Sequence, residues 1–261
     1  NLNNVKIIDS SWHLPNQNRD AIKEYSNEHI INSVFFDIDK NSDQETDLPH
    51  MLPSAKKWED IVSNLGISNN DNIIIYDNSD VVSSCRCWYT FRYFGHDASL
   101  VSVLDGGLKK WKHEGKPTVN YKTIINKSRY RALEKKKMVK SKFEIDKNIN
   151  LKKFKVVDAR SYERFKGIVP EIRPNVKSGS IEGSSCLPFT RIINKNNNTF
   201  KNIDELNQIF NEVIDTQDNN IVFSCGSGVT ASVLALAYSL INNKYTPTIY
   251  DGSWSEYGLI K

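Results

Sequence analysis

The sequence predicts an α/β protein made of two tandem copies of one unit, each a mainly parallel β-sheet flanked by helices. Three observations support this prediction: four sequence blocks recur in one order, β-branched runs alternate with helix-period segments, and a Lys-rich segment separates the halves. A chain of 261 residues is long enough for two domains of ordinary size. We therefore expect a domain at residues 1–125, a linker at 126–150 and a second domain at 151–261.

The repeat consists of short blocks whose partners lie about 150 residues apart in the chain. An apolar run closed by an aspartate occurs twice, as VKIIDSSW (Val5–Trp12) and FKVVDARSY (Phe154–Tyr162). The other pairs are HIINSVFFDI with SIEGSSCLPF, DNIIIYDNSD with NNIVFSCGSG, and VSVLDGGLKKW with PTIYDGSWSEY. Because all four pairs keep the same order, the sequence indicates a duplication of one fold.

Within each copy, the hydrophobic pattern distinguishes strands from helices. Strands are predicted at the β-branched runs Ile73–Tyr76 and Ile221–Ser224. Helices are predicted at SAKKWEDIVSNLG, TASVLALAYSLINN and NIDELNQIFNEV. The last of these has one apolar side, formed by Leu206, Ile209, Phe210 and Val213. The segment Ala132–Lys155 is rich in lysine and poor in apolar periodicity, so we expect a solvated linker there.

Composition excludes several classes of protein. No apolar run approaches the roughly 20 residues that cross a bilayer, so we expect no membrane partner. The net charge of +4 comes from 35 basic and 31 acidic residues spread along the chain, which predicts no nucleic-acid partner. The four cysteines have the spacing of neither a disulfide framework nor a zinc site, which indicates a reducing compartment. We expect a cytoplasmic protein, and the start at Asn1 rather than Met leaves an organelle open.

The motif CGSGVTA begins with the residue that is most suited to chemistry, Cys225. It follows a predicted strand, at a position that the first copy fills with Asp77. Gly226 and Gly228 permit a tight loop of amides, and a helix start near Val229 adds further unpaired amides. These groups favour the thiolate form of Cys225, which is the nucleophile. The alternative is a buried structural cysteine, and we assign that role to Cys85, Cys87 and Cys186.

The blocks DSSWHLP, FFDID, HMLPS, VLDGGLKKW, CGSGVTA and YDGSW resemble those of the rhodanese superfamily, and within it the tandem-domain 3-mercaptopyruvate sulfurtransferases. The resemblance covers nearly the whole chain. It implies two rhodanese-like domains, of which the first is catalytically inactive and the second active. The thiosulfate-using relatives typically have a basic side chain just after the cysteine, whereas Gly226 and Ser227 are neutral.

The resemblance also implies a persulfide relay without a metal or an organic cofactor. Cys225 attacks the sulfur of 3-mercaptopyruvate, pyruvate leaves, and the persulfide passes its outer sulfur to an acceptor. That acceptor is thioredoxin, a small thiol or cyanide. The anionic sulfur is held by the loop, whose binding residues are Gly226, Gly228, Val229 and Thr230.

Two arginines match the family's carboxylate-binding positions, Arg164 in DARSYERFKG and Arg173 in PEIRPN. A planar guanidinium suits the carboxylate of the donor. The alternative for each is an ordinary surface arginine. We expect Arg160 to be structural and paired near Asp158.

Proton transfer is assigned in such enzymes to a serine, a histidine and an aspartate, which match Ser227, His50 and Asp39 in this sequence. The resemblance implies that Asp39 and His50 come from the first domain. The alternative roles are a loop hydrogen bond for Ser227, a loop cap for His50 and a turn for Asp39. Arg86 is a candidate wall residue of the site.

Three other functions compete with this interpretation. A thiosulfate sulfurtransferase differs only in the donor that fits the loop. A dual-specificity phosphatase needs an arginine at the end of its cysteine loop, where this chain has Thr230, Ala231 and Ser232. A non-catalytic binding module would keep the fold and take up no sulfur.

Overall fold

The computed structural model describes residues 4–216 and 218–260. It divides into two compact units, each of which contains short segments from the other half of the sequence. The first unit comprises Asn1–Gln44, Leu52–Lys135 and Asn196–Thr199. The second unit comprises Glu45–Met51, Lys136–Lys195 and Phe200–Lys261.

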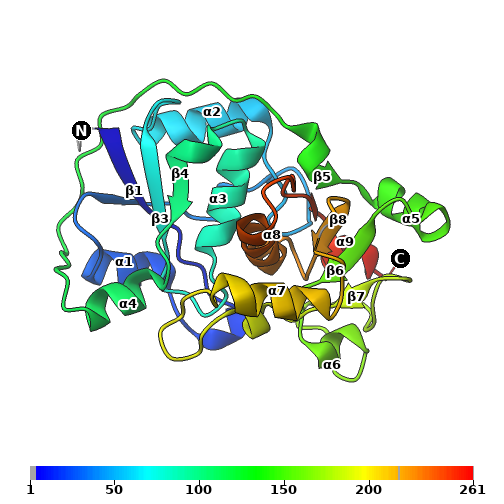
Figure 1. Ribbon diagram of the computed structural model, residues 1–261. Helices are drawn as coiled ribbons and strands as arrows, with labels where there is room; N and C mark the ends of the chain where they lie inside the picture. Colours follow the sequence, from blue (N-terminus) through cyan, green and yellow to red (C-terminus); the bar gives the residue numbers. More distant parts are fainter. Residues whose placement is uncertain (1–3, 217, 261) are drawn as a thin grey trace. The chain divides into compact units, whose positions relative to one another are not determined.

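The sheet of the first unit has four parallel strands in the order β2-β1-β3-β4, of which Figure 1 labels β1, β3 and β4. These strands are β1 (Val5–Asp9), β2 (Ser33–Phe35), β3 (Asn72–Tyr76) and β4 (Val101–Val103). Each connection between parallel strands crosses over through a helix or a long loop, as parallel pairing requires. The predicted strand at Ile73–Tyr76 is therefore β3, extended by one residue.

Helices cover both faces of this sheet, with α1 and α4 on one side and α2 and α3 on the other (Figure 1). Their bounds are α1 (Ala21–Asn27), α2 (Ala55–Asn64), α3 (Ser84–Tyr93) and α4 (Gly107–His113). On the side of α2, the ring of Trp58 stacks on Phe94 at 5.1 Å and meets Phe91 edge-on at 4.9 Å. On the opposite side, Tyr76 and Leu108 form a second buried cluster.

The sheet of the second unit has five parallel strands in the order β5-β9-β8-β6-β7. These strands are β5 (Val139–Lys140), β6 (Lys155–Asp158), β7 (Ser185–Cys186), β8 (Ile221–Ser224) and β9 (Ile249–Tyr250). Without the edge strand β5, the order is that of the first sheet, strand for strand. The duplication predicted from the four sequence blocks is confirmed.

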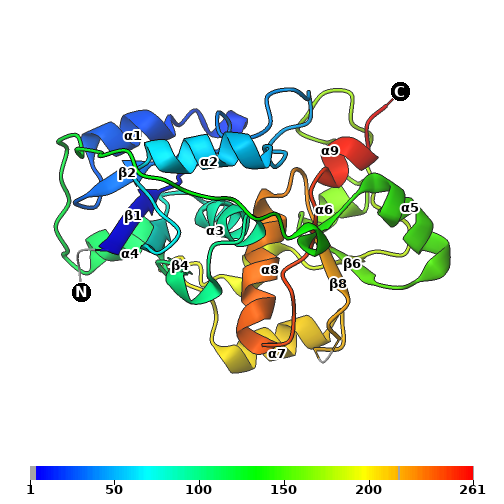
Figure 2. The same ribbon diagram turned by 90° about the horizontal axis from the view of Figure 1, so that it is seen from above.

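The helices of the second unit also lie on both faces of their sheet (Figure 2). Their bounds are α5 (Lys142–Leu151), α6 (Tyr162–Phe165), α7 (Ile203–Asn211), α8 (Val229–Ile241) and α9 (Ser253–Tyr257). On one face, Phe223 of β8 meets Phe210 at 6.1 Å and Tyr238 at 5.9 Å, which joins α7 and α8 to the strand. On the other face, Ile145 and Trp254 pack in one cluster, so α5 and α9 close that side.

The Lys-rich segment differs from its prediction. Residues 136–150, which we expected to belong to a linker, form β5 and nearly all of α5 in the second unit. Helix α5 begins at a capping box, in which Ser141 and Glu144 bond each other's backbone amides. Ile145 and Asn148 are the buried residues of this helix, and one of the two is polar, so the sequence has no continuous apolar side that would predict a helix.

Short 3-10 helices complete the structure at Pro15–Gln17, Ala98–Leu100, Lys136–Met138 and Phe189–Ile192. No helix within the described residues is long and apolar enough to span a membrane.

Candidate active site

Cys225 is the first residue after β8, at the carboxyl edge of the second sheet. All four residues of β8 are buried, and the strand lies between β6 and β9, so its end is held on both sides. Ligands of open parallel sheets bind at this edge. Cys225 is 2% exposed; its amide donates to Ser253 Oγ at 3.2 Å, and its carbonyl accepts from the Trp254 amide at 2.9 Å.

The loop that follows Cys225 is fixed through its carbonyl groups. The Gly226 carbonyl accepts from both the amide and the hydroxyl of Ser255, at 2.9 and 2.5 Å. Gly228 has a φ of +83°, in the left-handed region, and caps helix α8. Within residues 4–216 and 218–260, the amides of residues 226–230 donate to no protein acceptor. This arrangement leaves a nest of donors beside Cys225 for an anion.

Ser227 lies between a histidine and an arginine. His50 Nδ1 is 2.8 Å from Ser227 Oγ, and Arg173 Nη2 donates to the same oxygen at 3.3 Å. An arginine only donates, so Ser227 Oγ accepts from Arg173, while the tautomer of His50 sets which group donates between Ser227 and His50. His50 is buried and belongs to the segment Glu45–Met51 of the second unit. The structure therefore joins two of the three predicted relay residues, and it places His50 in the second unit rather than the first.

Asp39, the third predicted relay residue, belongs to the first unit. Its Oδ2 accepts from the indole Nε1 of Trp12 at 3.0 Å. Arg86 is buried on α3 of the same unit, with its guanidinium 5.7 Å from the ring of Tyr89. The roles of Asp39 and Arg86 at the site stay predictions.

Both predicted carboxylate-binding arginines approach the open face of Gly226. A Cβ atom built on Gly226 would lie 3.4 Å from Arg164 Nη2 and 3.6 Å from Arg173 Nη1. The absence of a side chain at residue 226 therefore leaves a space that two guanidinium groups line. Arg164 is placed by the short helix α6, where its amide donates to the capping hydroxyl of Ser161 at 3.4 Å.

Arg164 is also part of a chain of buried charges. Asp158 Oδ2 lies 2.7 Å from Arg160 Nη2, and Arg160 Nη1 lies 2.6 Å from Glu171 Oε1. The other Glu171 oxygen contacts Arg164 Nη2. The Arg160 guanidinium lies 4.5 Å from the ring of Trp254, so aromatic and carboxylate groups surround it. The predicted pairing of Arg160 with Asp158 is confirmed, and its structural role stays a prediction.

Sequence reasoning missed three polar residues of this site: Glu171, Ser253 and Ser255. Glu171 stands in PEIRPN between the two predicted arginines, and a carboxylate between two cations is a signal for pairing. Ser253 has a φ of +49°, which only the structure reveals. Its hydroxyl donates to the carbonyl of Tyr250 at 2.8 Å, so it connects β9 to the Cys225 amide.

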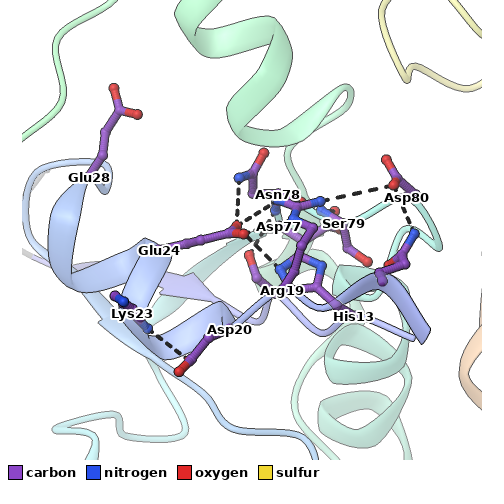
Figure 3. A network of polar contacts seen from close by, with 12 residues as sticks. His13, Arg19, Asp20, Lys23, Glu24, Glu28, Asp77, Asn78, Ser79 and Asp80 are labelled. Carbon is purple, nitrogen blue, oxygen red and sulfur yellow. Dashed lines mark hydrogen bonds and ion pairs between the residues drawn. The ribbon is translucent and has the colours of Figure 1, made fainter. Parts of the chain in front are cut away.

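The corresponding position of the first sheet holds an aspartate in place of the cysteine. Asp77 follows β3 as Cys225 follows β8, and its carboxylate accepts from the amides of Ser79 and Ser84 at 2.9 Å. Burial raises the pKa of Asp77 above its ordinary value. Figure 3 shows the ion pairs around this position, where Arg19 binds Glu24 side-on with N–O distances of 2.6 and 2.7 Å. The position that Cys225 fills in the second unit is thus occupied by a closed polar network.

The other cysteines are poor nucleophiles. Cys85 and Cys87 are fully buried, and burial raises the pKa of both thiols well above the ordinary value. Burial also raises the pKa of Cys186 to about 12. In the part of the chain that the structure describes, no group of three His, Cys, Asp or Glu side chains is arranged to hold a metal ion.

A family model matches both halves of the chain. The model described as a rhodanese-like domain matches residues 2–114 and again residues 141–259. These two matches correspond to the two sheets and their helices.

Named relatives include users of two sulfur donors. The chain is 37% identical over 255 residues to 3-mercaptopyruvate sulfurtransferase from Mus musculus, covering 97% of this chain and 84% of the relative. It is 34% identical over 255 residues to thiosulfate sulfurtransferase from Gallus gallus, covering 97% of this chain and 86% of the relative.

A solved structure of the same architecture is SseA from Escherichia coli, which is described with the rhodanese fold and catalytic mechanism of 3-mercaptopyruvate sulfotransferases. It superposes with a TM-score of 0.85 and 31% identity, covering 97% of this chain and 93% of that chain. The match extends over both units rather than one.

Proposed function

The chain belongs to the rhodanese family and is a sulfurtransferase, and we propose that its sulfur donor is 3-mercaptopyruvate. The observation that carries this proposal is the pair of guanidinium groups beside Gly226, from Arg164 and Arg173. The donor has a carboxylate next to its keto group, and a guanidinium binds a carboxylate through two parallel N–H bonds. A carboxylate held at Gly226 brings the donor sulfur to the adjacent Cys225.

In the first half-reaction, the Cys225 thiolate attacks the sulfur of 3-mercaptopyruvate. An S–S bond forms and the bond between the donor's sulfur and C3 breaks. The electron pair of that bond stays on the organic fragment as the enolate of pyruvate. The thiol proton of the donor then moves to C3, so pyruvate leaves and Cys225 holds a persulfide anion beside the amides of residues 226–230.

Ser227 and His50 provide the route for that proton. The Ser227 hydroxyl and His50 Nδ1 share a hydrogen bond, so a proton taken from the donor can be exchanged through a pair of groups 2.8 Å apart. Arg173 donates to the same hydroxyl and holds it in place. We include Asp39 as the third member of the relay, on the resemblance of its FFDID block.

In the second half-reaction, an acceptor thiolate attacks the outer sulfur of the persulfide. The S–S bond breaks, Cys225 returns to the thiolate, and the acceptor leaves as a persulfide. Thioredoxin or a small thiol supplies this thiolate. With cyanide as the acceptor, the cyanide carbon attacks the outer sulfur and the product is thiocyanate. The transfer needs no added oxidant and no bound cofactor.

Thiosulfate is the second candidate donor, since thiosulfate sulfurtransferases are nearly as similar to this chain as 3-mercaptopyruvate sulfurtransferases. Thiosulfate carries two negative charges, and the two residues after Cys225 are the neutral Gly226 and Ser227. A second charge on the donor thus meets no cationic side chain within the loop. This difference favours the singly charged donor.

The experiment that tests the proposal measures kcat/KM with each donor, using the same acceptor thiol. We expect a strong preference for 3-mercaptopyruvate. A preference for thiosulfate would refute the donor assignment while leaving the sulfurtransferase reaction intact.

Mass spectrometry tests the nucleophile and the binding-module alternative together. After incubation with 3-mercaptopyruvate and removal of excess donor, the wild-type chain should gain one sulfur atom on the peptide that contains Cys225. The Cys225→Ser variant should gain none. If the wild type takes up no sulfur from either donor, the persulfide mechanism fails and a binding role is the better account.

A further inference from the structure

Glu171 forms ion pairs with two arginines whose surroundings differ. Its side chain is 4% exposed, and its Oε1 accepts from Arg160 Nη1 at 2.6 Å and from Arg164 Nε at 3.3 Å. Its Oε2 accepts from Arg164 Nη2. Arg160 is fully enclosed, whereas Arg164 is 20% exposed and approaches Gly226. Glu171 thus connects the buried charge chain to the substrate space.

The contact with Glu171 determines which edge of Arg164 faces the loop. A guanidinium has five N–H groups, and Glu171 takes the Nε–H and one Nη2–H, the side-on pair. Three N–H groups remain, two on Nη1 and one on Nη2, and the end-on pair consists of one from each nitrogen. Nη2 lies 3.4 Å from the Cβ position of Gly226. Because Glu171 occupies the side-on edge, the end-on edge is the one left for a ligand beside Gly226.

Arg160 does not depend on Glu171 alone for its partners. Arg160 already binds Asp158 through both carboxylate oxygens, at 2.7 to 3.1 Å, and it donates to the carbonyl of Gly179 at 2.8 Å. Arg164 stands on a helix of four residues, which restrains its backbone but not its long side chain. In the described residues, the side-chain contacts recorded for the Arg164 guanidinium are those with Glu171.

We propose that Glu171 is a positioning residue that holds the end-on edge of Arg164 toward Gly226 and thereby sets the affinity for the carboxylate of donor and product. This inference deepens the proposed function, because it takes Arg164 as the carboxylate-binding group. Glu171 contacts no reacting atom and acts through Arg164 alone.

Two effects of Glu171→Gln have opposite signs, which makes the variant informative. Removal of a negative charge close to the site strengthens anion binding by Coulomb attraction alone. The new amide, however, places an N–H donor against the Arg164 edge, where two donors repel, so the guanidinium turns away from Gly226. Positioning predicts weaker binding, and simple electrostatics predicts tighter binding.

The test measures how well pyruvate, the carboxylate-bearing product, protects Cys225 from alkylation by iodoacetamide. We expect Glu171→Gln to raise the pyruvate concentration for half-protection about tenfold, the effect of a misplaced supporting group. In turnover, KM for 3-mercaptopyruvate should rise by a similar factor while kcat stays within about twofold. The matched control is Glu163→Gln, which removes the same charge from an exposed position next to Arg164 and should change neither value.

A double-mutant cycle tests whether Glu171 acts through Arg164. We expect Arg164→Ala to weaken pyruvate binding and Glu171→Gln to add less than about a twofold further effect in that background. Glu171→Asp, which keeps the charge and the acceptors, should recover most of the lost affinity.

Tighter or unchanged pyruvate binding in Glu171→Gln, or full additivity with Arg164→Ala, would overturn the inference. Circular dichroism of each variant establishes that it is folded, and Glu171→Ala, which also removes both acceptor oxygens, takes the place of Glu171→Gln in the cycle if the glutamine variant is not. The protection assay needs no sulfur transfer. A wild type that rejects 3-mercaptopyruvate therefore refutes the proposed donor, whereas the pyruvate cycle separately decides the role of Glu171.

Discussion

His50 Nδ1 lies 2.8 Å from Ser227 Oγ, although 177 residues separate the two in the chain. Arg173 donates to the same oxygen, so Ser227 Oγ contacts both a cation and an imidazole. An unprotonated Nδ1 accepts the hydroxyl proton, whereas a protonated Nδ1 donates to the hydroxyl. His50 holds this place with a φ of +61°, a left-handed conformation that is uncommon outside glycine. Such local strain is found at functional sites, where the surrounding structure enforces it.

The first prediction concerns Ser227→Ala. Loss of the hydroxyl breaks the proton route, so kcat with 3-mercaptopyruvate should fall about 100-fold, within the range of general acid–base effects. KM should change little because Arg164 and Gly226 are untouched. Ser239→Ala is the control: that hydroxyl donates to the Ala235 carbonyl within α8, and its loss should leave kcat unchanged. A wild-type kcat in Ser227→Ala would show that the hydroxyl only supports the loop.

The second prediction concerns the coupling of His50 to Ser227. Asparagine tolerates positive φ, so His50→Asn removes the imidazole without added backbone strain. If the two residues form one proton route, the double variant His50→Asn with Ser227→Ala should have a kcat within about twofold of the slower single variant. Steady-state kinetics on all four proteins provides the cycle. Multiplicative losses would indicate two independent roles.

The third prediction separates two glycines of the same loop. In Gly226→Ala, the new methyl group stands 3.4 to 3.6 Å from the two guanidinium groups, so it fills the donor space and should raise KM at least tenfold. In Gly228→Ala, the φ of +83° strains any L side chain, so the free energy of unfolding should fall by about 1–2 kcal/mol. Kinetics and urea unfolding of both variants check the contrast. Equal effects on stability would contradict it.

The repeat made most of the fold predictable. Each pair of sequence blocks falls on a pair of corresponding strands, and the predicted helix at 202–213 buries Leu206, Ile209 and Phe210 as expected. Helix α5 was missed because Phe143 and Leu151 are exposed, so its sequence has no continuous apolar side. A helix that is stabilised mainly by its capping box and two buried residues has no strong hydrophobic periodicity in its sequence.

The site was predictable where chemistry has a local motif. The cysteine loop and the two arginines occur in short recognisable blocks, and the structure brings Gly226 and both arginines together. The placement of His50 in the second unit depends on tertiary packing, which no local pattern encodes. The role proposed for Glu171 depends on which edge of the Arg164 guanidinium it binds, and only atomic positions reveal that edge.

The fourth prediction concerns the buried pair of Arg160 and Asp158, whose side chains are 1% and 2% exposed. Arg160→Met keeps much of the volume but leaves the Asp158 carboxylate buried without its cation. Loss of one partner from a buried pair costs about 3–5 kcal/mol.

The control is Arg191→Met, which breaks an exposed pair with Glu212 and should cost less than about 1 kcal/mol. Urea unfolding of both variants measures the difference. A similar small cost for both would mean that Asp158 is solvated or protonated at little expense once Arg160 is gone.

The fifth prediction concerns the pH dependence of stability in the first unit. Burial raises the pKa of Asp9 from 3.8 to about 6, although hydrogen bonds from Ser11 oppose the shift. Because the pKa is higher in the folded state, Asp9 stabilises the fold fully below about pH 4, and this contribution is lost as the pH rises through about 6. A shift of two pKa units corresponds to about 3 kcal/mol.

Asp9→Asn keeps the Oδ1 acceptor that binds the amide and hydroxyl of Ser11 at 2.9 and 2.6 Å, and it cannot ionise. Its free energy of unfolding relative to the wild type should therefore rise between pH 4 and pH 7, by up to about 3 kcal/mol. Asp60→Asn is the control, because Asp60 is an exposed carboxylate paired with Lys56. Its free energy of unfolding relative to the wild type should not rise between pH 4 and pH 7. A difference for Asp9→Asn that is constant across this range would mean that the buried carboxyl titrates as it does in the unfolded chain.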